Sequence, residues 1–550
     1  MSDPSPYYRK AREEGFGFYY DPLYGYIPLN ELLRQAIDLP EVQRLRHLHQ
    51  LAVLSLVFPG ATHSRFSHSI GLSYLCEVEW NNLIHKRKSF QIGKDEEINL
   101  GQNLLLAIQL ASIFHDVGHG PFSHIFEMFC ERYQKYGEFT HEQITRRLIT
   151  KGIGEYRNIP FFLNELCKQK KDYMSPGELE LFSPESIANL VEGNPPVSKE
   201  YADYAFLGQL LHSPYDIDRL DYLRRDAYYT GVEIGGVDVW EIIYNFLIYK
   251  DKQTNILNLG IDIKAAEAIE ALLFARDLAY RKVYYNIAHR SNQELIIRGI
   301  QNLIESGEDN ISTLVLNDDY ELIEKFQKRG VITKEIADRI KKRRLYEPLP
   351  IKLNLDADFD KTSRARRADI WKIKYQEVMD KEEELSKDCS IWENNNRIIF
   401  DYELVPVAED NNYTECYLFD TITGESCSLL KALPHLELIY GEYKQPGVPI
   451  SLLGPLYRNK QSNFFVYVPY EFIDESVQKM NKKIQESGIE KNDEKIIPFI
   501  ENDCTDILDP FQKICEAFVT LVNIPKEKQS ELLNHFKKQM VTYLNKLRTV

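Results

Sequence analysis

The fold and chemistry of this chain are decided by the stretch Phe114-His115-Asp116-Val117-Gly118-His119-Gly120-Pro121-Phe122-Ser123-His124. An apolar run over residues 104–114 leads into it, and its composition predicts a buried helix. A histidine and an aspartate therefore stand side by side where that helix ends, before a turn with two glycines and a proline. Neutral imidazole and carboxylate form the ligand mix of catalytic divalent metals. The dipeptide alone is weak support, because a capped helix end with surface histidines gives the same pattern.

More histidines and aspartates extend this pattern along the chain. Of the 13 histidines, nine lie between His47 and His141, and one of these is His68. An acidic cluster follows in the stretch Tyr215-Asp216-Ile217-Asp218-Arg219-Leu220-Asp221-Tyr222-Leu223-Arg224-Arg225-Asp226. Spacing alone does not choose which of its first three aspartates would join the histidines.

His68, the pair His115-Asp116 and an aspartate of this cluster resemble the metal set of the HD-domain phosphohydrolases. The chain is similar to their deoxynucleoside triphosphate triphosphohydrolase branch, including the core of the animal enzymes that carry a sterile alpha motif. The likeness covers about residues 15–350, so we expect no sterile alpha motif before the core. It implies that His68, His115, Asp116 and Asp218 are the metal ligands. Asp218 is selected because Asp218-Arg219, Tyr222 and Asp226 match the family pattern Asp-Lys-x-x-Tyr-x-x-x-Asp.

Two imidazoles and two carboxylates leave coordination positions for water and a phosphate oxygen. A metal held in this way lowers the pKa of water and polarises phosphorus. Mixed nitrogen and oxygen ligation favours Mn, Fe or Zn, whereas Mg can act together with a triphosphate. We therefore expect a divalent metal cofactor of one of these four kinds.

Phosphoryl transfer also needs a proton for the leaving oxygen, and histidine suits this role near neutral pH. The candidates are His119, His124 and His141. The resemblance implies that His124 is the catalytic histidine and His141 a further active-site histidine. Glu127 stands where the family usually has Asp, and its carboxylate is expected to orient the imidazole and raise its pKa. Alternatively, Glu127 is a helix-surface residue, and His141 is a helix N-terminal residue after Thr140.

The resemblance also implies a nucleotide pocket, made of Gln50, Leu51, Arg65, Arg219, Tyr222, Asp226 and Tyr284. In the family the Gln and Leu contact the sugar, and the Leu and Tyr284 close the space of a 2′-hydroxyl. Asp226 matches the acceptor of the 3′-hydroxyl, Tyr222 packs beside it, and the two arginines match phosphate-binding cations. These matches imply a deoxynucleoside triphosphate, with dGTP one candidate. Periodicity alone would place Leu51 and Tyr284 in an ordinary core, and Tyr285 in place of a family Gln leaves the base open.

Regulation by nucleotides is also implied. Three residues match a guanine-nucleotide effector site, and one matches a phosphate contact of a second site; these are Asp38, Gln43, Arg46 and Lys264. A family Lys is replaced by Gly17, and Asp262 and Glu241 fall at or near family Arg positions. Because anions repel a triphosphate, we hypothesise that one effector site is retained and that the other is lost or binds another ligand. The strip Arg343-Arg344 resembles a family basic strip, or is a solvated helix end.

Composition narrows the remaining options. A net charge of −16 argues against a general nucleic-acid surface, which needs a basic face. The eight cysteines contain no C-x-x-C pair, so neither a zinc ribbon nor a disulfide framework is indicated. No apolar run reaches the ~18–20 residues of a membrane span. The N-terminus lacks a signal-peptide pattern, so we expect a cytoplasmic protein.

The expected fold is mainly α, with an HD-domain helical core over 1–350, a charged connector over 351–395 and a small α+β region over 396–550. Residues 15–30 predict a strand or hairpin, and residues 29–345 read as mostly helical. Helices are predicted over 104–114, 121–133, 265–285 and 470–550, and a solvated helix over 369–385. Alternation near residues 398–402, 415–419 and 464–468 predicts one small antiparallel sheet.

Three functions compete on the sequence. The first is a metal-dependent dNTP triphosphohydrolase that assembles as a homo-oligomer, as its family does. The second is an HD phosphodiesterase or nucleotidase acting on a cyclic dinucleotide, a monophosphate or a single strand. The third is a nucleotide-sensing scaffold without catalysis. The pocket residues favour the first, and no expected metal ligand is missing. Nucleotide depletion as antiviral defence would fit such an enzyme, although no residue indicates it.

Overall fold

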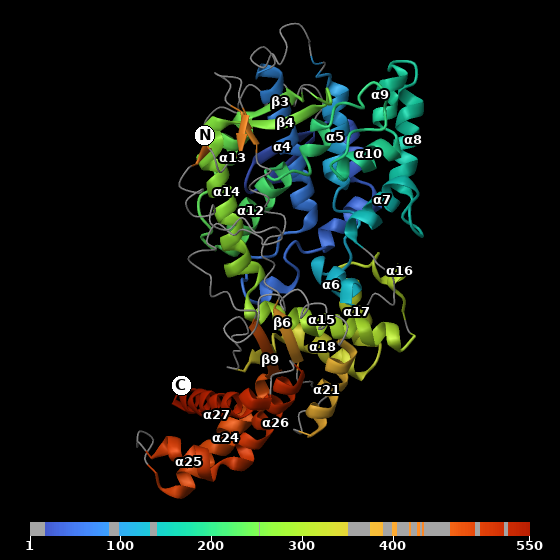
Figure 1. Cartoon of the computed structure of the whole chain (residues 1–550). Helices are drawn as coiled ribbons and strands as arrows, with labels where there is room; N and C mark the ends of the chain where they lie inside the picture. The colour runs from blue at the N-terminus through green and yellow to red at the C-terminus, as the bar shows by residue number, and fades with distance from the viewer. Residues whose placement is uncertain are drawn as a thin grey trace, which may run out of the picture. The chain divides into compact units, whose positions relative to one another are not determined.

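The computed structural model describes residues 17–86, 98, 100–132, 140–251, 253–307, 309–349, 375–388, 399–403, 417–419, 426–428, 432–433, 463–489, 495–521 and 526–549. Helices dominate this part of the chain (Figure 1), which confirms the mainly α fold class. The chain divides into two compact units. The first is Met1–Tyr284 with Ile311–Leu322 and Val407–Leu456; the second is Tyr285–Asn310 with Ile323–Pro406 and Tyr457–Val550. The domain boundaries predicted at 350 and 395 lie outside the described residues and stay predictions.

Three helices form the centre of the first unit: α4 (Arg65–Lys86), α5 (Gln102–Phe114) and α12 (Ile217–Thr230). α4 packs against both of the others. α5 buries ten of its 13 residues, because a helix that is apolar all round has no face for water. This confirms the helix predicted over 104–114. His115 is its C-cap residue, so the His-Asp pair leaves the helix inside the protein.

The other helices of the first unit surround these three. They are α2 (Glu31–Ile37), α3 (Pro40–Arg44), α6 (His124–Arg132), α7 (His141–Thr150), α8 (Asn158–Lys170), α9 (Pro176–Leu181), α10 (Pro184–Val191), α11 (Phe206–Gln209), α13 (Val239–Asn245), α14 (Ala266–Ala279) and α16 (Ile311–Leu314), with short 3₁₀ helices η1 (Leu45–His47), η2 (Ala52–Leu56) and η4 (Ile263–Ala265).

Two predicted helices differ from expectation at one end. α6 begins at His124 rather than at Pro121, because Phe122 and Ser123 have φ angles of 58° and 54°. A left-handed backbone cannot continue a right-handed helix. The helix predicted over 265–285 is present as α14, but it ends in a π-helical segment, η5 (Tyr280–Tyr284). Such widened turns are frequent at functional sites.

In the described part of the chain, the strands form three small sheets. The hairpin predicted over 15–30 is confirmed as β1 (Gly17–Asp21) paired antiparallel with β2 (Gly25–Leu29). A second hairpin, β3 (Phe246–Lys250) and β4 (Leu257–Asp262), was not predicted inside the mostly helical region. Its two strands are five and six residues long, which is too short for an unambiguous period.

The single antiparallel sheet predicted near residues 398–468 is wrong. β7 (Tyr417–Phe419) pairs antiparallel with β8 (Ser426–Ser428) and parallel with β4, in the first unit. β6 (Ile399–Glu403) and β9 (Asn463–Pro469) instead pair antiparallel in a sheet with β5 (Tyr346–Pro348), in the second unit. Alternation marks a strand but carries no information on its partner.

The second unit contains α15 (Ile287–Glu305), α18 (Val331–Lys342) and α21 (Tyr375–Asp388). α17 (Asp319–Lys328) begins in the first unit and continues into the second. The helix predicted as solvated over 369–385 is α21, and one face of it is buried. Glu382 lies on that face because Arg298 of α15 neutralises it, with Nη2 2.6 Å from Oε1. The expectation of a solvated helix is therefore wrong for this face, and residues 369–374 of the predicted range lie outside the described residues.

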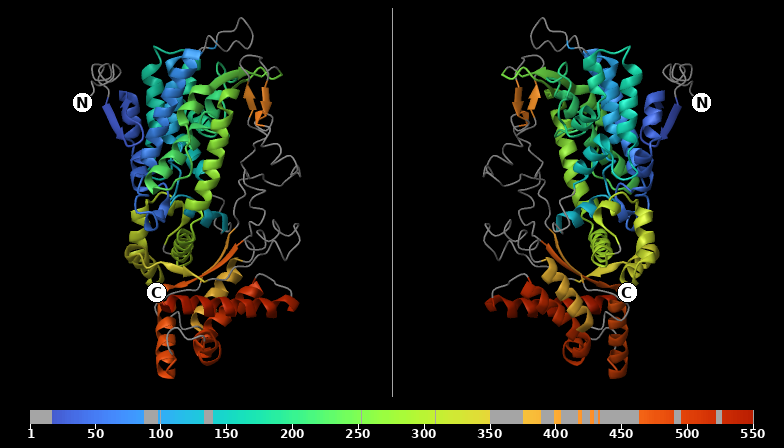
Figure 2. Two further views of the ribbon diagram at one scale, coloured as in Figure 1. Left: turned by 90° about the vertical axis from the view of Figure 1, so that its left-hand side faces the viewer. Right: turned by 90° about the vertical axis from the view of Figure 1, so that its right-hand side faces the viewer.

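The helical tail predicted over 470–550 is confirmed for residues 470–489, 495–521 and 526–549. It consists of α24 (Tyr470–Ser487), α25 (Ile496–Asp503), α26 (Thr505–Leu521) and α27 (Lys526–Thr549), drawn in red in Figure 2. These helices share an apolar core that includes Phe511, Phe536 and Met540. Among the described residues, no helix combines the length and the apolar character that crossing a membrane requires.

Candidate metal centre

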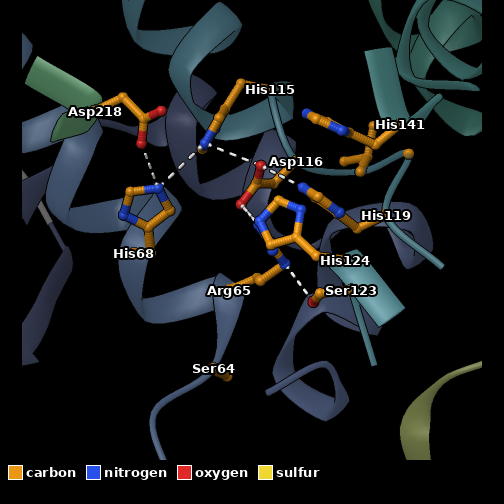
Figure 3. A network of polar contacts seen from close by, with 12 residues as sticks. Ser64, Arg65, His68, His115, Asp116, His119, Ser123, His124, His141 and Asp218 are labelled. Carbon is orange, nitrogen blue, oxygen red and sulfur yellow. Dashed lines mark hydrogen bonds and ion pairs between the residues drawn. The ribbon is translucent and has the colours of Figure 1, made fainter. Parts of the chain in front are cut away.

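Three donor side chains from three helices meet at one point of the first unit. His68 comes from α4, His115 from the end of α5 and Asp218 from the first turn of α12 (Figure 3). The two histidine Nε2 atoms are 3.2 Å apart, and Asp218 Oδ1 lies 2.9 Å from His68 Nε2. All three donor atoms lie within 4.8 Å of one another. Two imidazole nitrogens and a carboxylate oxygen at this spacing can hold one metal ion.

Asp116, the fourth expected ligand, adjoins these donors. Its Oδ1 is 3.2 Å from His115 Nε2, and its Oδ2 is 2.6 Å from Arg65 Nη1. Burial alone would raise the pKa of Asp116, but the Arg65 guanidinium together with His115 and His119 outweighs burial and holds it well below its usual range. A charged carboxylate therefore stands beside the two histidines.

The Nδ1 atoms of both histidines have hydrogen-bond partners, and these partners fix the orientation of the Nε2 atoms. His68 Nδ1 donates to Asp221 Oδ2 at 2.7 Å, and His115 Nδ1 donates to the Ser112 carbonyl at 2.7 Å. Carboxylates and carbonyls in this position set the tautomer and the orientation of metal-binding histidines. The Nε2 lone pairs are thus free to face a cation, so the donor set fits a divalent metal.

The three aspartates that spacing could not separate have different contacts. Asp216 is the N-cap of α12 and accepts from the backbone N–H of Arg219. Asp221 accepts from His68 and pairs with Arg225, whose Nε is 2.8 Å from its Oδ2. Only Asp218 of the three belongs to the group of converging donors, within the described part of the chain. The geometry therefore supports Asp218 as the ligand proposed from the family pattern.

A second cluster joins the candidate proton-transfer groups. Glu127 on α6 accepts from His124 Nδ1 at 2.8 Å, from the backbone N–H of His141 at 2.9 Å and from the His141 ring. The His141 ring stacks on His119 with centroids 4.0 Å apart, and His119 Nε2 is 3.3 Å from Asp116 Oδ1. The four expected catalytic residues are thus brought together, and the three histidines among them lie next to the candidate metal ligands in Figure 3.

Glu127 governs the charges in this second cluster. Burial would raise its pKa, but the hydrogen bonds from His124 and His141 outweigh burial and lower it. For His141 burial would lower the pKa, but the hydrogen bond to Glu127 together with the charges of Glu127, Glu142 and Asp116 raises it instead. Glu127 is therefore an ionised residue that organises two histidines, rather than a helix-surface residue.

Two residues that the sequence did not indicate hold the turn after the His-Asp pair. Arg44 Nη2 donates to the carbonyls of Val117 and His119 at 2.8 and 2.7 Å. Asp319 accepts from the backbone N–H of Phe122 at 2.6 Å. These bonds offset the strain of the left-handed backbone at Phe122. Neither residue has a local sequence signal, since both act on main-chain groups far away in the chain.

Most of the expected sugar-pocket residues also meet. Asp226 accepts from the Tyr284 hydroxyl at 2.6 Å, and Leu51 packs in one apolar cluster with Tyr284. A further residue, His63, bonds Asp226 and was not predicted. Tyr222 lies on α12 with Asp226, and burial is the main cause of its raised pKa.

The two arginines expected to bind phosphate differ. Arg65 is buried, and its Nε donates to Ser123 Oγ at 2.7 Å. Its Nη2 is buried without a hydrogen-bond partner among the described residues, so one donor beside the metal ligands stays available. Arg219 donates to the Pro214 carbonyl at 3.2 Å, and its Nε is 3.7 Å from Asp216. The structure therefore turns Arg219 toward the start of its own helix.

The expected effector residues lie at the surface or near it. Gln43 donates to the Ile37 carbonyl, next to the exposed Asp38, and Arg46 donates to Gln43 at 2.8 Å. The Arg46 guanidinium also lies 3.6 Å from the centre of the Phe66 ring.

The second effector position is different. Lys264 is exposed, and Asp262 caps η4 by accepting from the Lys264 backbone N–H at 3.0 Å. Glu241 is exposed on α13.

Tyr285 belongs to the second unit, where the Arg290 guanidinium lies 5.6 Å from its ring centre. In that unit Arg344 pairs with Glu335 and Glu471, so this basic strip is partly neutralised.

Several known proteins are similar to parts of this chain. A family model described as HD associated region matches residues 237–416. The deoxynucleoside triphosphate triphosphohydrolase SAMHD1 of Danio rerio is 32% identical over 217 residues, 39% of this chain and 33% of that protein. The uncharacterised protein YwfO of Bacillus subtilis is 31% identical over 279 residues, 50% of this chain and 54% of that protein. The chain thus spans between about a third and a half of these relatives.

Two solved structures share the fold. A phosphohydrolase of Bacteroides thetaiotaomicron superposes with a TM-score of 0.55 at 21% identity, over 82% of this chain and all of that one. A hypothetical protein of Aquifex aeolicus superposes with a TM-score of 0.52 at 22% identity, over 83% and 97% of the two chains. The chain is thus similar to HD-domain, deoxynucleoside triphosphate triphosphohydrolase-like proteins, and its donors His68, His115 and Asp218 converge at one point.

Proposed function

We propose that this chain is a metal-dependent phosphoric ester hydrolase and that its substrate is a deoxynucleoside triphosphate. The observation that carries the hydrolase proposal is the convergence of His68, His115 and Asp218 beside the ionised Asp116. Each histidine donates its Nδ1–H to a protein oxygen, as metal-binding histidines commonly do. A divalent ion bound by these four residues would lower the pKa of water and polarise the phosphorus.

The residues around the metal ligands would bind the phosphate and donate the proton that the reaction needs. In the proposed reaction, water attacks the α-phosphorus, the bond to the 5′-oxygen breaks, and deoxynucleoside and triphosphate leave. Arg65 offers its unpartnered Nη2 to a phosphate oxygen. The leaving 5′-oxygen takes a proton, and the exposed ring of His124, oriented by Glu127, is our candidate donor.

Two arguments support a deoxynucleotide as the substrate. Leu51, Asp226 and Tyr284 come together from three segments of the chain, as a sugar pocket requires. The animal relatives are named for the hydrolysis of deoxynucleoside triphosphates, although the chain matches only about a third of their length. A generic phosphodiesterase does not need a carboxylate and a tyrosine in this pairing.

Regulation and assembly extend the proposal. We expect a homo-oligomer that binds a nucleotide effector at Asp38, Gln43 and Arg46, and we expect the protein to act in the cytoplasm. The Arg46–Gln43 hydrogen bond supports this effector site, whereas Asp262 beside Lys264 disfavours a triphosphate at the second. Rates measured with each dNTP as an added activator test this, and activation that needs two different nucleotides would contradict it.

The test of the main proposal is turnover by purified protein. With Mn²⁺ and each of the four dNTPs and rNTPs, ion-exchange chromatography should resolve triphosphate and deoxynucleoside. His115→Ala removes a ligand and should abolish turnover, whereas His212→Ala changes an exposed histidine and should not. Absence of turnover for every nucleotide, tested alone and in mixtures, would reject the proposal and favour a phosphodiesterase, which cyclic dinucleotides and single-stranded DNA would then test.

A further inference from the structure

His63 is a buried histidine next to the expected sugar pocket, and no role was expected for it. It lies two residues before α4, and its side chain is fully buried. Its Nε2 is 2.7 Å from Asp226 Oδ1, across 163 positions of sequence. A carboxylate can only accept, so the histidine donates this hydrogen bond.

The other oxygen of Asp226 is held as well. The Tyr284 hydroxyl donates to Asp226 Oδ2 at 2.6 Å. Burial, and next the charge of Asp226, raise the pKa of Tyr284 well above its usual value, so the phenol keeps its proton and donates. Each carboxylate oxygen has two lone pairs. His63 and Tyr284 thus fix the carboxylate and still leave it able to accept from a substrate hydroxyl.

The imidazole of His63 is itself immobilised. It stacks on Tyr229, with ring centroids 4.5 Å apart and an interplanar angle of 21°. Tyr229 lies three residues after Asp226 on α12, so both contacts of the ring come from one helix face. Its Nδ1 is buried and has no hydrogen-bond partner in the described part of the chain. A neutral ring with its proton on Nε2 avoids burying an unpaired N–H.

The main chain of His63 contacts a further pocket residue. Its carbonyl accepts from the backbone N–H of Gln50 at 3.0 Å. One residue therefore connects the segment of Gln50 and Leu51 with the carboxylate of Asp226. A substrate sugar held by these groups would depend on the position of His63.

We propose that His63 is a positioning residue that aims the Asp226 carboxylate at the sugar 3′-hydroxyl and so sets the preference for substrates that carry this hydroxyl. The inference rests on the proposed function, in which Asp226 accepts from the sugar. His63 does not touch the reacting phosphate in this role. Its loss should weaken recognition of the 3′-hydroxyl and leave the chemistry of the metal centre in place.

The experiment compares a dNTP with its 2′,3′-dideoxy counterpart, which lacks the 3′-hydroxyl. Values of kcat and KM are measured for the wild type, His63→Phe, His63→Gln and, as a control, His85→Gln at the exposed far end of α4. Phe keeps a ring to stack on Tyr229 but cannot donate, whereas Gln keeps an N–H donor. Thermal unfolding of each variant shows that it is folded.

We expect His63→Phe to lose roughly 10- to 100-fold in kcat/KM on the dNTP and little on the dideoxy substrate, as for a buried charged acceptor that loses its donor. His63→Gln should recover part of the loss, and His85→Gln should match the wild type. If His63→Phe lost kcat/KM equally on both substrates, or on neither, the proposed role of His63 would be overturned, while the proposed function would stand. A wild type that hydrolyses no dNTP would overturn the proposed function, and this inference with it.

Discussion

His68 Nδ1 lies 2.7 Å from Asp221 Oδ2, and this contact turns the other ring nitrogen of His68 toward His115 and Asp218. Asp221 is completely buried and also pairs with Arg225, so its carboxylate is fixed on both sides. A buried carboxylate behind a metal-binding histidine sets the ring orientation and increases ligand basicity.

Substitution of Asp221 should therefore weaken metal binding without removing a ligand. We expect Asp221→Asn to lower the affinity for Mn²⁺ by roughly 10- to 100-fold, as is usual when a residue that hydrogen-bonds a metal-binding histidine is changed. Arg225 keeps a partner in Asp21, at 2.8 Å, which limits the damage to the fold. Titration calorimetry with Mn²⁺ measures the change, with Asp172→Asn at an exposed position as the control. Equal affinities of Asp221→Asn and the wild type would show that the contact does not orient His68.

Substitution of Glu127 should impair catalysis without impairing metal binding. Glu127→Gln removes the charge that His124 and His141 share, so we expect turnover to fall by roughly 100-fold or more, the scale of a general acid–base contribution. The metal ligands are unchanged, so Mn²⁺ content should stay at the wild-type level. Parallel measurement of kcat and bound metal checks this. Loss of the metal together with turnover would instead assign Glu127 to the metal site.

The sequence predicted the parts of the site that stand in local patterns. The apolar helix before His115 and the hairpin at the N-terminus follow from composition and spacing, and both are present. Arg44, Asp319 and His63 could not be predicted, because each bonds a group 73 or more positions away and no local pattern marks it. The pairing of β7 with β4 was missed for the same reason.

Gly118 should tolerate no side chain. A Cβ at this position would lie 2.3 Å from the carbonyl oxygen of His141 and 2.3 Å from the backbone nitrogen of Thr145. Because both are backbone atoms of α7, the helix itself would have to move, at a cost of about 1–3 kcal/mol or more. We expect Gly118→Ala to lower the Tm and the activity together. Gly236→Ala, where a Cβ meets no atom within 4 Å, is the control and should change neither. Wild-type values for Gly118→Ala would mean that α7 can shift freely.

His289 makes the stability of the second unit depend on pH. It is buried in α15, where burial, and next the charge of Arg290, lower its pKa from 6.5 to about 3. Its Nε2 contacts Gln293 Nε2 at 2.9 Å, and its Nδ1 has no partner among the described residues, so the folded protein holds a neutral ring. Between these two pKa values the unfolded chain binds a proton that the folded chain does not.

Stability contributed by this neutral histidine is therefore fully present above about pH 6.5 and falls as the pH drops toward 3, by ~1.4 kcal/mol per pH unit. Denaturant midpoints of the wild type should decrease over this range more steeply than those of His289→Gln, because the amide does not titrate. His535→Gln, at an exposed histidine of the same unit, should keep the wild-type slope. Carboxylates that titrate below pH 5 affect all three proteins alike, so the difference in slope isolates His289. Parallel slopes for His289→Gln and the wild type would show that His289 is protonated in the folded state.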